Sequence, residues 1–492
     1  MNAETEYFFR HALLREAAYQ LQLPGDRARL HALAFGAIEE MAGGRPANSQ
    51  DLGIGEERFS PHASDPFALE MAGHARLAAD DRDGSPGAPS FRDAHVIYLR
   101  RAAEHAERSH QAETAEALWQ QHSEIVTGPD SGESLRRAAV VADRAGHIRI
   151  AEPLFRRALE IQCASGNRRL EGITSHWFGI HLRGVGRIEE ARNQLLHAAR
   201  ILREEGNRGP AGKALSSLAV LYRLTGRLQE AEECFTQALQ ALREAGDRAG
   251  ESTAVSGLAT LQFQTGRSES AEKNFHLALE LQRTSGMRRA EGTSLGHLAI
   301  LYRKTGRVAL AERTHEEALA IHREVGNRSA EGLLLTNLAL LNQDAGRLHR
   351  AEDLYSEGLA ILREVGDRLG EGVGLGNLAG LYGLTRRFDA ADHTYAKALS
   401  LHREVQNIRA EAAHLCDWAL FMLHTRRVDR ARELWTSGSA ILRTIGDPRL
   451  TAEKVDSLRQ GCIQAGVPPF EGLGPQGAPE NETGAAGKAA PE

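Results

Sequence analysis

The sequence predicts an all-α protein, a right-handed superhelical solenoid of antiparallel helix pairs that follows an N-terminal helical module. Three observations support this prediction. The sequence repeats itself every 40 residues over most of its length. Each repeat carries two turn signals at fixed positions, which divide it into two helices. Leucine and alanine dominate the apolar residues while aromatic residues make up only 5%, a composition that suits helices better than sheets.

The turn signals keep one step without an insertion or deletion. The first is a Gly-x-Arg motif, in which x is Asn or Asp in most copies. It begins at Gly166, Gly206, Gly246, Gly286, Gly326 and Gly366, and decays at Gln406 and at Gly446. The second is a Gly-Arg pair that begins at Gly186, Gly226, Gly266, Gly306 and Gly346, and becomes Arg-Arg at Arg386 and Arg426. Together they predict seven equal repeats over residues 167–446.

Residues 207–246 indicate how one repeat folds. Asn207 is placed to cap the first helix by accepting hydrogen bonds from its free amides. That helix should bury one face made of Leu215, Leu218, Ala219 and Tyr222. Gly226 supplies the left-handed turn that ends it, and the second helix should bury Ala231, Phe235, Ala238, Leu239 and Leu242.

Alanines recur where the two helices of a repeat should approach closely. On the first helix they are Ala219, Ala259, Ala299, Ala339, Ala379 and Ala419. On the second helix they are Ala191, Ala231, Ala271, Ala311, Ala351, Ala391 and Ala431. A bulkier side chain at such a contact would overpack it, typically at a cost of about 1–3 kcal/mol.

This pattern of Leu, Ala, Tyr, Gly, Ala, Phe and Ala resembles the tetratricopeptide consensus, with Leu in place of the usual Trp. The 40-residue length is similar to the longer-helix repeats of kinesin light chains and of bacterial regulators of the MalT type. The resemblance covers about residues 131–446 and includes a looser unit over 131–166, with Gly146 at its turn. It implies a concave groove, lined by the first helices, that binds a peptide or a partner protein.

The N-terminal residues resemble a different element. Residues 8–19 form an expected amphipathic helix, and a second helix is expected from Asp26, after Pro24-Gly25. Over residues 7–120 the sequence resembles the segment between the ATPase and the repeats in large bacterial signal-transduction ATPases. The resemblance leaves two hypotheses open. The chain is a scaffold or sensor arm, or it is the detached regulatory half of an ATPase, cyclase or kinase that is encoded separately or lost upstream.

The sequence divides into four expected parts. Residues 1–42 are an N-terminal helical pair, and 43–130 are a loop-rich helical linker with loops at 43–66 and 80–92. Residues 131–464 form the solenoid, which ends in a capping helix. The tail at 465–492 lacks the apolar residues to build a core and is expected to be disordered.

Composition and motifs argue against several functions. A net charge of -6 gives no general support for nucleic-acid binding. No apolar stretch approaches the roughly 18–20 residues that span a bilayer, and no signal peptide is evident, so we expect a cytoplasmic protein. The four cysteines are scattered and the 21 histidines form no HExxH motif, so no metal or cofactor is expected.

Catalytic motifs are also missing from the sequence. The nearest approaches to a P-loop are Gly212-Lys213 and Gly487-Lys488, which lack its spaced glycine and following hydroxyl. We therefore expect no enzymatic activity. A recurring Arg-x-x-Glu motif, which begins at Arg248, Arg288, Arg328 and Arg368, is interpreted as a structural ion pair in the first turn of the first helix.

The concave groove is the expected binding site. Its lining is taken from the first helices, at positions next to the core Leu-Ala pair and one turn further on. These positions are Ser216, Ser217, Arg223, Thr260, His297, Arg303, Thr336, Asn337 and Asn377. Small side chains leave room for an extended peptide, and amides can bond its backbone. The resemblance to kinesin light chains, which use groove asparagines, implicates Asn337 and Asn377. The alternative is that a wide groove simply tolerates such residues.

Overall fold

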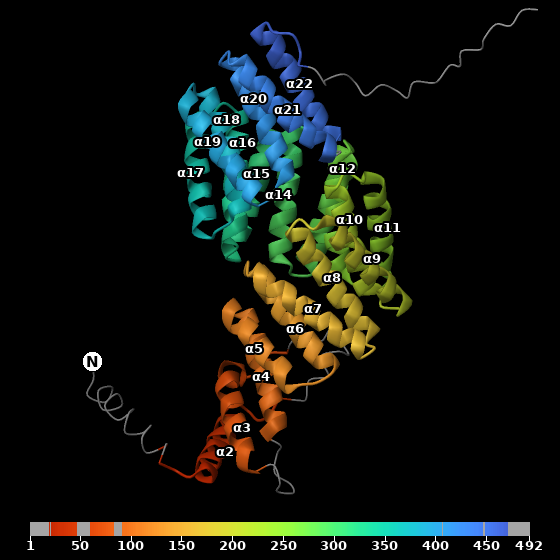
Figure 1. Cartoon of the computed structure of the whole chain (residues 1–492), viewed down its shortest axis with the longest axis vertical. Helices are drawn as coiled ribbons and strands as arrows, with labels where there is room; N and C mark the ends of the chain where they lie inside the picture. The colour runs from red at the N-terminus through yellow and green to blue at the C-terminus, as the bar shows by residue number, and fades with distance from the viewer. Residues whose placement is uncertain are drawn as a thin grey trace, which may run out of the picture. The chain divides into compact units, whose positions relative to one another are not determined.

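A computed structural model of the chain describes Tyr19 and residues 21–46, 60–82, 91–405, 407–445 and 448–470. Within these residues it contains 21 α-helices and no strand, which confirms the all-α prediction (Figure 1). The chain forms two compact units, Met1–Ser217 and Leu218–Glu492. In the described ranges no helix is both long and apolar enough to cross a membrane.

The first unit begins with the N-terminal helices and continues into the repeats. Its elements are α2 (Pro24–Met41), η1 (Asp65–Phe67), α3 (Ala68–Arg82), α4 (Phe91–Arg108), α5 (Ala112–Ile125), α6 (Pro129–Arg144), α7 (Ile148–Ala164), α8 (Arg168–Gly184) and α9 (Ile188–Glu204). Helix α2 starts at Pro24, two residues before its expected start, because proline suits the first position of a helix. The expected helix at 8–19, apart from Tyr19, lies outside the described residues, as do loop residues 47–59 and 83–90 and tail residues 471–492.

The second unit holds the remaining repeats. Helix α10 (Arg208–Leu224) begins in the first unit and ends in the second. It is followed by α11 (Leu228–Glu244), α12 (Arg248–Gln264), α13 (Ser268–Thr284), α14 (Arg288–Lys304), α15 (Val308–Glu324), α16 (Arg328–Asp344), α17 (Leu348–Glu364), α18 (Arg368–Leu384), α19 (Phe388–Glu404), α20 (Ile408–His424), α21 (Val428–Ile445) and α22 (Pro448–Ala465). The even-numbered helices from α8 to α20 are the first helices of the repeats.

The predicted glycines end the helices of each repeat, and the predicted alanines lie where its two helices pack together. Gly306 and Gly326, which follow the two helices of one repeat, have φ values of 77° and 64°, the left-handed conformation that ends helices. All thirteen recurring alanines of the two helices have an exposure of 0%. Their full burial confirms that each repeat packs its helices through alanine.

The arginine after the second turn glycine joins neighbouring repeats. The guanidinium of Arg307 lies 4.4 Å from the ring centre of Tyr302, and it donates two hydrogen bonds of 2.8 Å to Glu272, one repeat earlier. These hydrogen bonds lower the pKa of Glu272. Arg387 makes the same contacts with Tyr382 and Glu352. The Gly-Arg signal therefore marks a turn and an inter-repeat clamp together.

The Arg-x-x-Glu motif builds a second clamp. Glu331 is buried at 4% exposure, and its carboxylate accepts hydrogen bonds from Arg323 at 2.7 Å and Arg328 at 2.6 Å. Arg328 also bonds Glu364 in the following helix. The motifs at Arg288 and Arg368 make the same contacts, so in these three repeats the motif ties the start of the first helix to the two second helices beside it, as its structural interpretation predicts.

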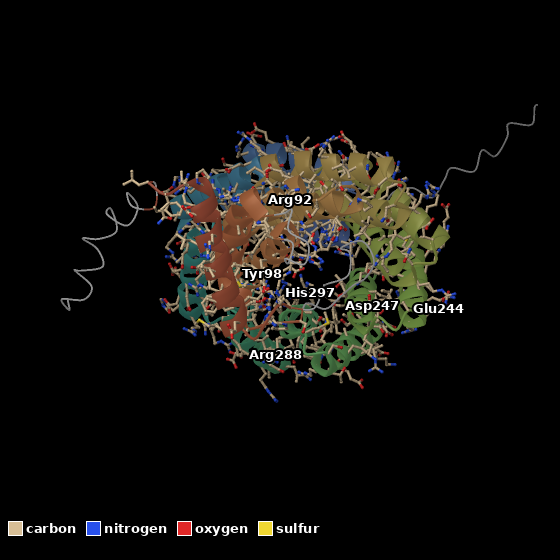
Figure 2. All side chains as sticks on the ribbon, turned by 90° about the horizontal axis from the view of Figure 1, so that it is seen from below. Arg92, Tyr98, Glu244, Asp247, Arg288 and His297 are labelled. Carbon is tan, nitrogen blue, oxygen red and sulfur yellow. The ribbon has the colours of Figure 1, made fainter. Side chains whose placement is uncertain are left out.

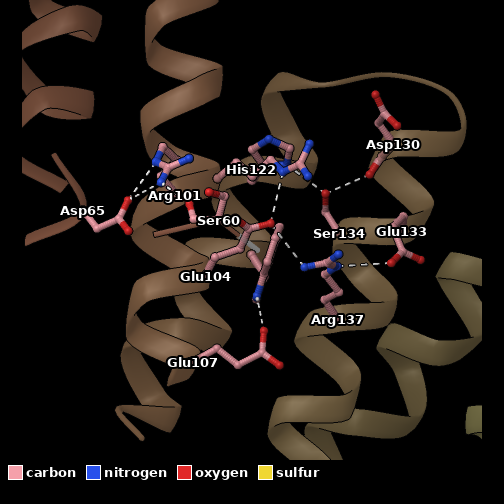
Figure 3. Close-up of polar contacts among 12 residues, drawn as sticks. Ser60, Asp65, Arg101, Glu104, Glu107, His122, Asp130, Glu133, Ser134 and Arg137 are labelled. Atoms are coloured by element: carbon pink, nitrogen blue, oxygen red, sulfur yellow. Dashed lines mark hydrogen bonds and ion pairs between the residues drawn. The ribbon is translucent and has the colours of Figure 1, made fainter. Parts of the chain in front are cut away.

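Charged side chains also hold the N-terminal helices of the first unit together (Figure 3). Asp65 is 5% exposed and accepts a 2.7 Å hydrogen bond from the buried Arg101 of α4. Arg137 of α6 bonds Glu133 at 3.1 Å and Glu104 at 3.4 Å, and its guanidinium lies 4.8 Å from the ring centre of Trp119. These interactions fix α4, α5 and α6 to one another.

Candidate peptide-binding groove

The first helices of the second unit line its inner face. Each second helix packs against the first helices on either side, but α12, α14, α16, α18 and α20 also contact one another in sequence. Helices that approach more closely on one side curve the array toward that side. In Figure 2, His297 on α14 lies on the inner side of these helices, whereas Glu244 on α11 lies on the outer side.

The inner face contains a cavity of about 330 Å³. Its walls come from α10, α12, α14, α20 and α22, and the residues that line it are Arg223, Thr260, Phe263, Gln264, Phe275, His297, Ile300, Lys304, Arg409, Leu450 and Glu453. One of these, Phe275, lies on α13. Figure 1 shows the start of α22 beside the end of α12, which brings Leu450 and Glu453 to the cavity. We name it the inner-face cavity.

The lining of the inner-face cavity combines apolar surface with positive charge. Phe263, Phe275 and Ile300 supply apolar walls, while Arg223, Lys304 and Arg409 carry positive charge. Among its lining residues, all of which the structure describes, Glu453 is the one carboxylate. It pairs with Lys304, the Nζ to Oε2 distance being 3.2 Å. The cavity therefore suits a ligand that is apolar and negatively charged.

Histidine 297 does not add to this positive charge near neutral pH. Its side chain is exposed to the inner face, but desolvation by the surrounding helices, followed by the charge of Arg223, lowers its pKa. The neutral imidazole can both donate and accept a hydrogen bond. Arg223 itself donates to Gln264 at 3.3 Å, which holds its guanidinium at the cavity wall.

The structure brings together only some of the predicted groove residues. Arg223, Thr260 and His297 line the cavity. Asn337 and Asn377 lie one repeat apart on α16 and α18, where both are half-buried. Neither side-chain amide forms a hydrogen bond with another residue in the described part of the chain. Both amides are thus available on the inner helices, outside the cavity itself.

Three of the other predicted residues, Ser217, Arg303 and Thr336, form hydrogen bonds or ion pairs within the protein. Ser217 is hydrogen-bonded to Nε2 of His176 at 2.9 Å, and Ser216 is half-buried. Arg303 pairs with Asp344 of the next first helix.

Thr336 is 1% exposed and donates to the carbonyl of Leu333. Its methyl group lies where Gly358 and Gly374 leave space, so it packs between helices and does not line the inner-face cavity.

The groove predicted from the sequence includes three of the eleven residues that line the cavity. The prediction considered only polar and small positions on the first helices, and so passed over Phe263, Ile300 and Lys304. It also gave α22 no role beyond capping, although Leu450 and Glu453 line the cavity. The spacing of these two residues, an apolar and an acidic side chain on one face of a helix, was the available signal. Among the described residues no group of three or more His, Cys, Asp or Glu is arranged to hold a metal ion.

Comparisons with known proteins identify the repeats. The family profile "Tetratricopeptide repeat" matches residues 170–244, 250–324 and 329–404. No curated protein sequence matches the chain. A solved structure of a Rap protein complexed with competence and sporulation factor is 15% identical with a TM-score of 0.55, over 73% of this chain and 99% of that chain. The structure of the apo form of RapI is 14% identical to this chain with a TM-score of 0.50, and the match covers 72% of this chain and 99% of RapI.

A third solved structure contains an ATPase as well as repeats. It is the signal-transduction ATPase with a tetratricopeptide-repeat sensor from Pyrococcus horikoshii, 14% identical with a TM-score of 0.46, over 72% of this chain and 55% of that chain. At these identities the two Rap structures show the fold that they share with this chain, and nothing beyond the fold. The profile matches agree with the observed helix pairs, and residues 170–404 of this chain are tetratricopeptide repeats.

Proposed function

We propose that this chain is a non-enzymatic binding protein that holds a peptide, or a segment of a partner protein, against the inner face of its first helices. The observation that carries the proposal is the inner-face cavity, where apolar walls and three positive charges converge on a surface built from helices. Ligand sites commonly combine a concave, mostly apolar surface with a few polar groups.

The amides of Asn337 and Asn377 extend this surface. They lie on consecutive first helices, and the repeat places them in equivalent positions. An extended peptide has unpaired backbone groups at regular intervals, and side-chain amides can satisfy both its donors and its acceptors. The fold shared with the Rap protein, whose structure is a complex with competence and sporulation factor, supports a binding role for this architecture.

A comparison of charge-reversed proteins tests the proposal. The inner-face variant is Arg223→Glu with Lys304→Glu, and the matched control is Lys273→Glu with Lys397→Glu. Both control lysines are exposed on second helices. Each pair changes the net charge by the same amount, so non-specific electrostatic capture should change equally. Wild type and both variants are used as bait in native lysate, and captured proteins are quantified by mass spectrometry.

We expect at least one partner that the wild type and the control variant capture equally and that the inner-face variant captures at least tenfold less. Thermal unfolding of all three proteins shows whether they are folded. If every captured protein binds the inner-face variant and the control variant equally, the inner face is not the binding surface.

A further inference from the structure

Helix α14 begins without the side-chain cap that other first helices have. Asp247 and Asp367, before α12 and α18, each accept a 2.8 Å hydrogen bond from the amide three residues further on. Met287 holds the equivalent position before α14 and makes no such bond. The amide of Ala290, three residues further on, has no hydrogen-bond partner among the described residues. The start of α14 therefore keeps an unpaired donor at the positive end of the helix dipole.

A cavity of about 720 Å³ lies at this end of α14. Its lining comes from α12, α13, α14 and the turn before α14. The lining residues are Thr253, Ser256, Gln282, Gly286, Met287, Arg288, Arg289, Ala290, Thr293 and Ser294. None of them lines the inner-face cavity. We name it the α14 cavity.

The next pair of first helices explains why this space is open. Between α14 and α16 the equivalent space is taken by Leu334, which lies so close to Gly296 that a Cβ placed on that glycine would be 3.1 Å from it. At the α14 cavity the same two positions are Ser294 and Ser256, whose hydroxyls are hydrogen-bonded at 3.1 Å. Two serines fill less volume than leucine and leave a polar wall.

Gln282 brings an unpaired polar atom to the α14 cavity. Its side chain is 1% exposed, and its Nε2 donates a 3.0 Å hydrogen bond to Ser294. Its Oε1 is buried and has no hydrogen-bond partner among the described residues. Turning the amide over would pair Oε1 with the hydroxyl of Ser294 and leave Nε2 unpaired. Because a buried polar group without a partner is destabilising, a ligand that supplies the partner is favoured.

The lining of the α14 cavity is positively charged. Its two ionisable residues are Arg288 and Arg289, and none of the lining residues is a carboxylate. Arg288 is already bonded to Glu291 and Glu324. Arg289 is exposed, and its guanidinium forms no hydrogen bond or ion pair within the described part of the chain. One guanidinium is therefore available to an anion.

We propose that the α14 cavity binds a phosphate monoester. Phosphate groups bind at helix N-termini, where free amides and the helix dipole favour negative charge, and guanidinium groups pair well with phosphate oxygens. The unpaired amide of Ala290 and the guanidinium of Arg289 supply these two kinds of donor. A cavity of about 720 Å³ has the size of a site for an organic ligand, about 300–1,000 Å³. The organic group of the ester fills the space beside the phosphate.

This inference goes beyond the proposed function, because it assigns a second site with its own ligand chemistry. The phosphate monoester can be a phosphorylated side chain of a partner or a free metabolite. Two probes distinguish these sources, the blocked peptide acetyl-Ala-Ala-phosphoserine-Ala-Ala-amide and glycerol 3-phosphate. Isothermal titration measures their binding to the full chain. We expect at least one probe to bind with a Kd below about 1 mM and at least tenfold more tightly than inorganic phosphate. The tighter probe identifies the source.

Three variants locate the site with the tighter probe. Met287→Asp supplies the missing cap, so its carboxylate takes the amide of Ala290 and repels the phosphate. We expect it to weaken binding at least tenfold while raising the melting temperature, so that the loss of binding does not come from unfolding. Arg289→Gln should also weaken binding about tenfold. Arg350→Gln, at an exposed arginine of α17, makes the same change in net charge and should leave the affinity unchanged.

Four results would overturn the inference. The first is that neither probe binds at about 10 mM. The second is that inorganic phosphate binds as tightly as both esters. The third is that Met287→Asp binds the probe as tightly as wild type. The fourth is equal affinity of Arg289→Gln and Arg350→Gln, which would show that net charge and not the α14 cavity attracts the probe. None of these results bears on partner binding at the inner-face cavity.

Discussion

Arg386 occupies the left-handed backbone position that Gly346 occupies 40 residues earlier. Their φ values are 59° and 75°. Both residues donate a backbone hydrogen bond to the carbonyl three residues before, at 3.2 Å from Arg386 and 3.0 Å from Gly346. The turn therefore keeps its geometry where the glycine signal disappears from the sequence, and Arg426, with a φ of 59°, repeats the substitution.

This relationship predicts that Arg386→Gly stabilises the protein. A residue with a Cβ is strained in the left-handed conformation by about 1–2 kcal/mol, and the extra freedom of glycine in the unfolded chain offsets part of the gain. We expect a net increase of about 0.5–1 kcal/mol in the free energy of unfolding, measured by urea denaturation. Gly346→Arg is the reciprocal control. No atom lies within 4 Å of a Cβ placed at Gly346, so the arginine should fit without a clash. The free energy of unfolding of this variant should fall by a similar amount, about 0.5–1 kcal/mol. A stability loss in Arg386→Gly would contradict this explanation.

The buried carboxylate of Glu331 predicts an asymmetry between its partners. Burial opposes its ionisation, but hydrogen bonds from Arg323 and Arg328 outweigh burial and lower its pKa. Removing both arginines leaves a buried, unpaired charge, whereas Glu331→Gln leaves two arginines that can reach water. We expect Arg323→Ala with Arg328→Ala to cost about 3 kcal/mol and Glu331→Gln about 1–2 kcal/mol, by urea denaturation.

The control for this prediction is an exposed ion pair. Arg157 and Glu160 are both 65% exposed, and Glu160→Gln should change stability by less than about 0.5 kcal/mol. If the double arginine variant and Glu331→Gln lower the free energy of unfolding equally, water reaches the carboxylate of Glu331 in spite of its burial.

A buried histidine makes the fold sensitive to acid. His315 is 1% exposed and neither ring nitrogen has a hydrogen-bond partner among the described residues. Burial, followed by the charge of Arg303, lowers its pKa to about 4, whereas an unfolded histidine has a pKa of about 6.5. Below pH 6.5 the unfolded chain binds a proton at this histidine more readily than the folded protein does. The free energy of unfolding therefore falls by up to about 1.4 kcal/mol per pH unit between pH 6.5 and 4, and this histidine does not lower it above pH 6.5.

Other buried histidines such as His402 titrate in the same window, so His315→Leu should reduce, by one histidine's share, the stability that is lost between pH 6.5 and 4. The measurement is urea denaturation at several pH values in that window. His393→Leu, at an exposed histidine of α19, controls for the loss of a histidine at the surface. If wild type and His315→Leu lose stability in parallel as the pH falls, His315 is not the group responsible.

The period of the sequence predicted the fold because each repeat is fixed by interactions within about 40 residues. Gly226 and Ala231 report a turn and a close helix contact, which depend on backbone geometry and volume. The inner-face cavity depends on the curvature that accumulates over the helices from α14 to α22 and brings Glu453 to Lys304. A sequence pattern within one repeat does not predict that curvature. Thr336 illustrates a finer limit. One residue rotates a helix position by about 100°, and this separates buried Thr336 from half-buried Asn337.

The two asparagines provide a test of the inner face beyond the cavity. Replacing Asn337 and Asn377 with Ala should weaken partner binding by roughly 5- to 150-fold if each lost hydrogen bond costs about 0.5–1.5 kcal/mol. Stability should change by less than about 0.5 kcal/mol because no intramolecular hydrogen bond is lost. Isothermal titration with the partner measures the affinity.

The control for the asparagines is Ala351→Leu, which overpacks a fully buried position. It should lower the melting temperature whether or not the partner is present. Unchanged affinity in the double Asn variant would restrict binding to the cavity or to another surface. Loss of both affinity and fold would make the asparagines structural.

The proposed function requires that a partner lies against the first helices of the second unit. Hydrogen exchange of the chain with and without the captured partner measures which helices the partner covers. We predict added protection in α12, α14, α16 and α18, with the greatest change around Thr260 and His297, and little change in α13, α15, α17 and α19. Protection confined to those second helices, or to the first unit, would contradict the claim.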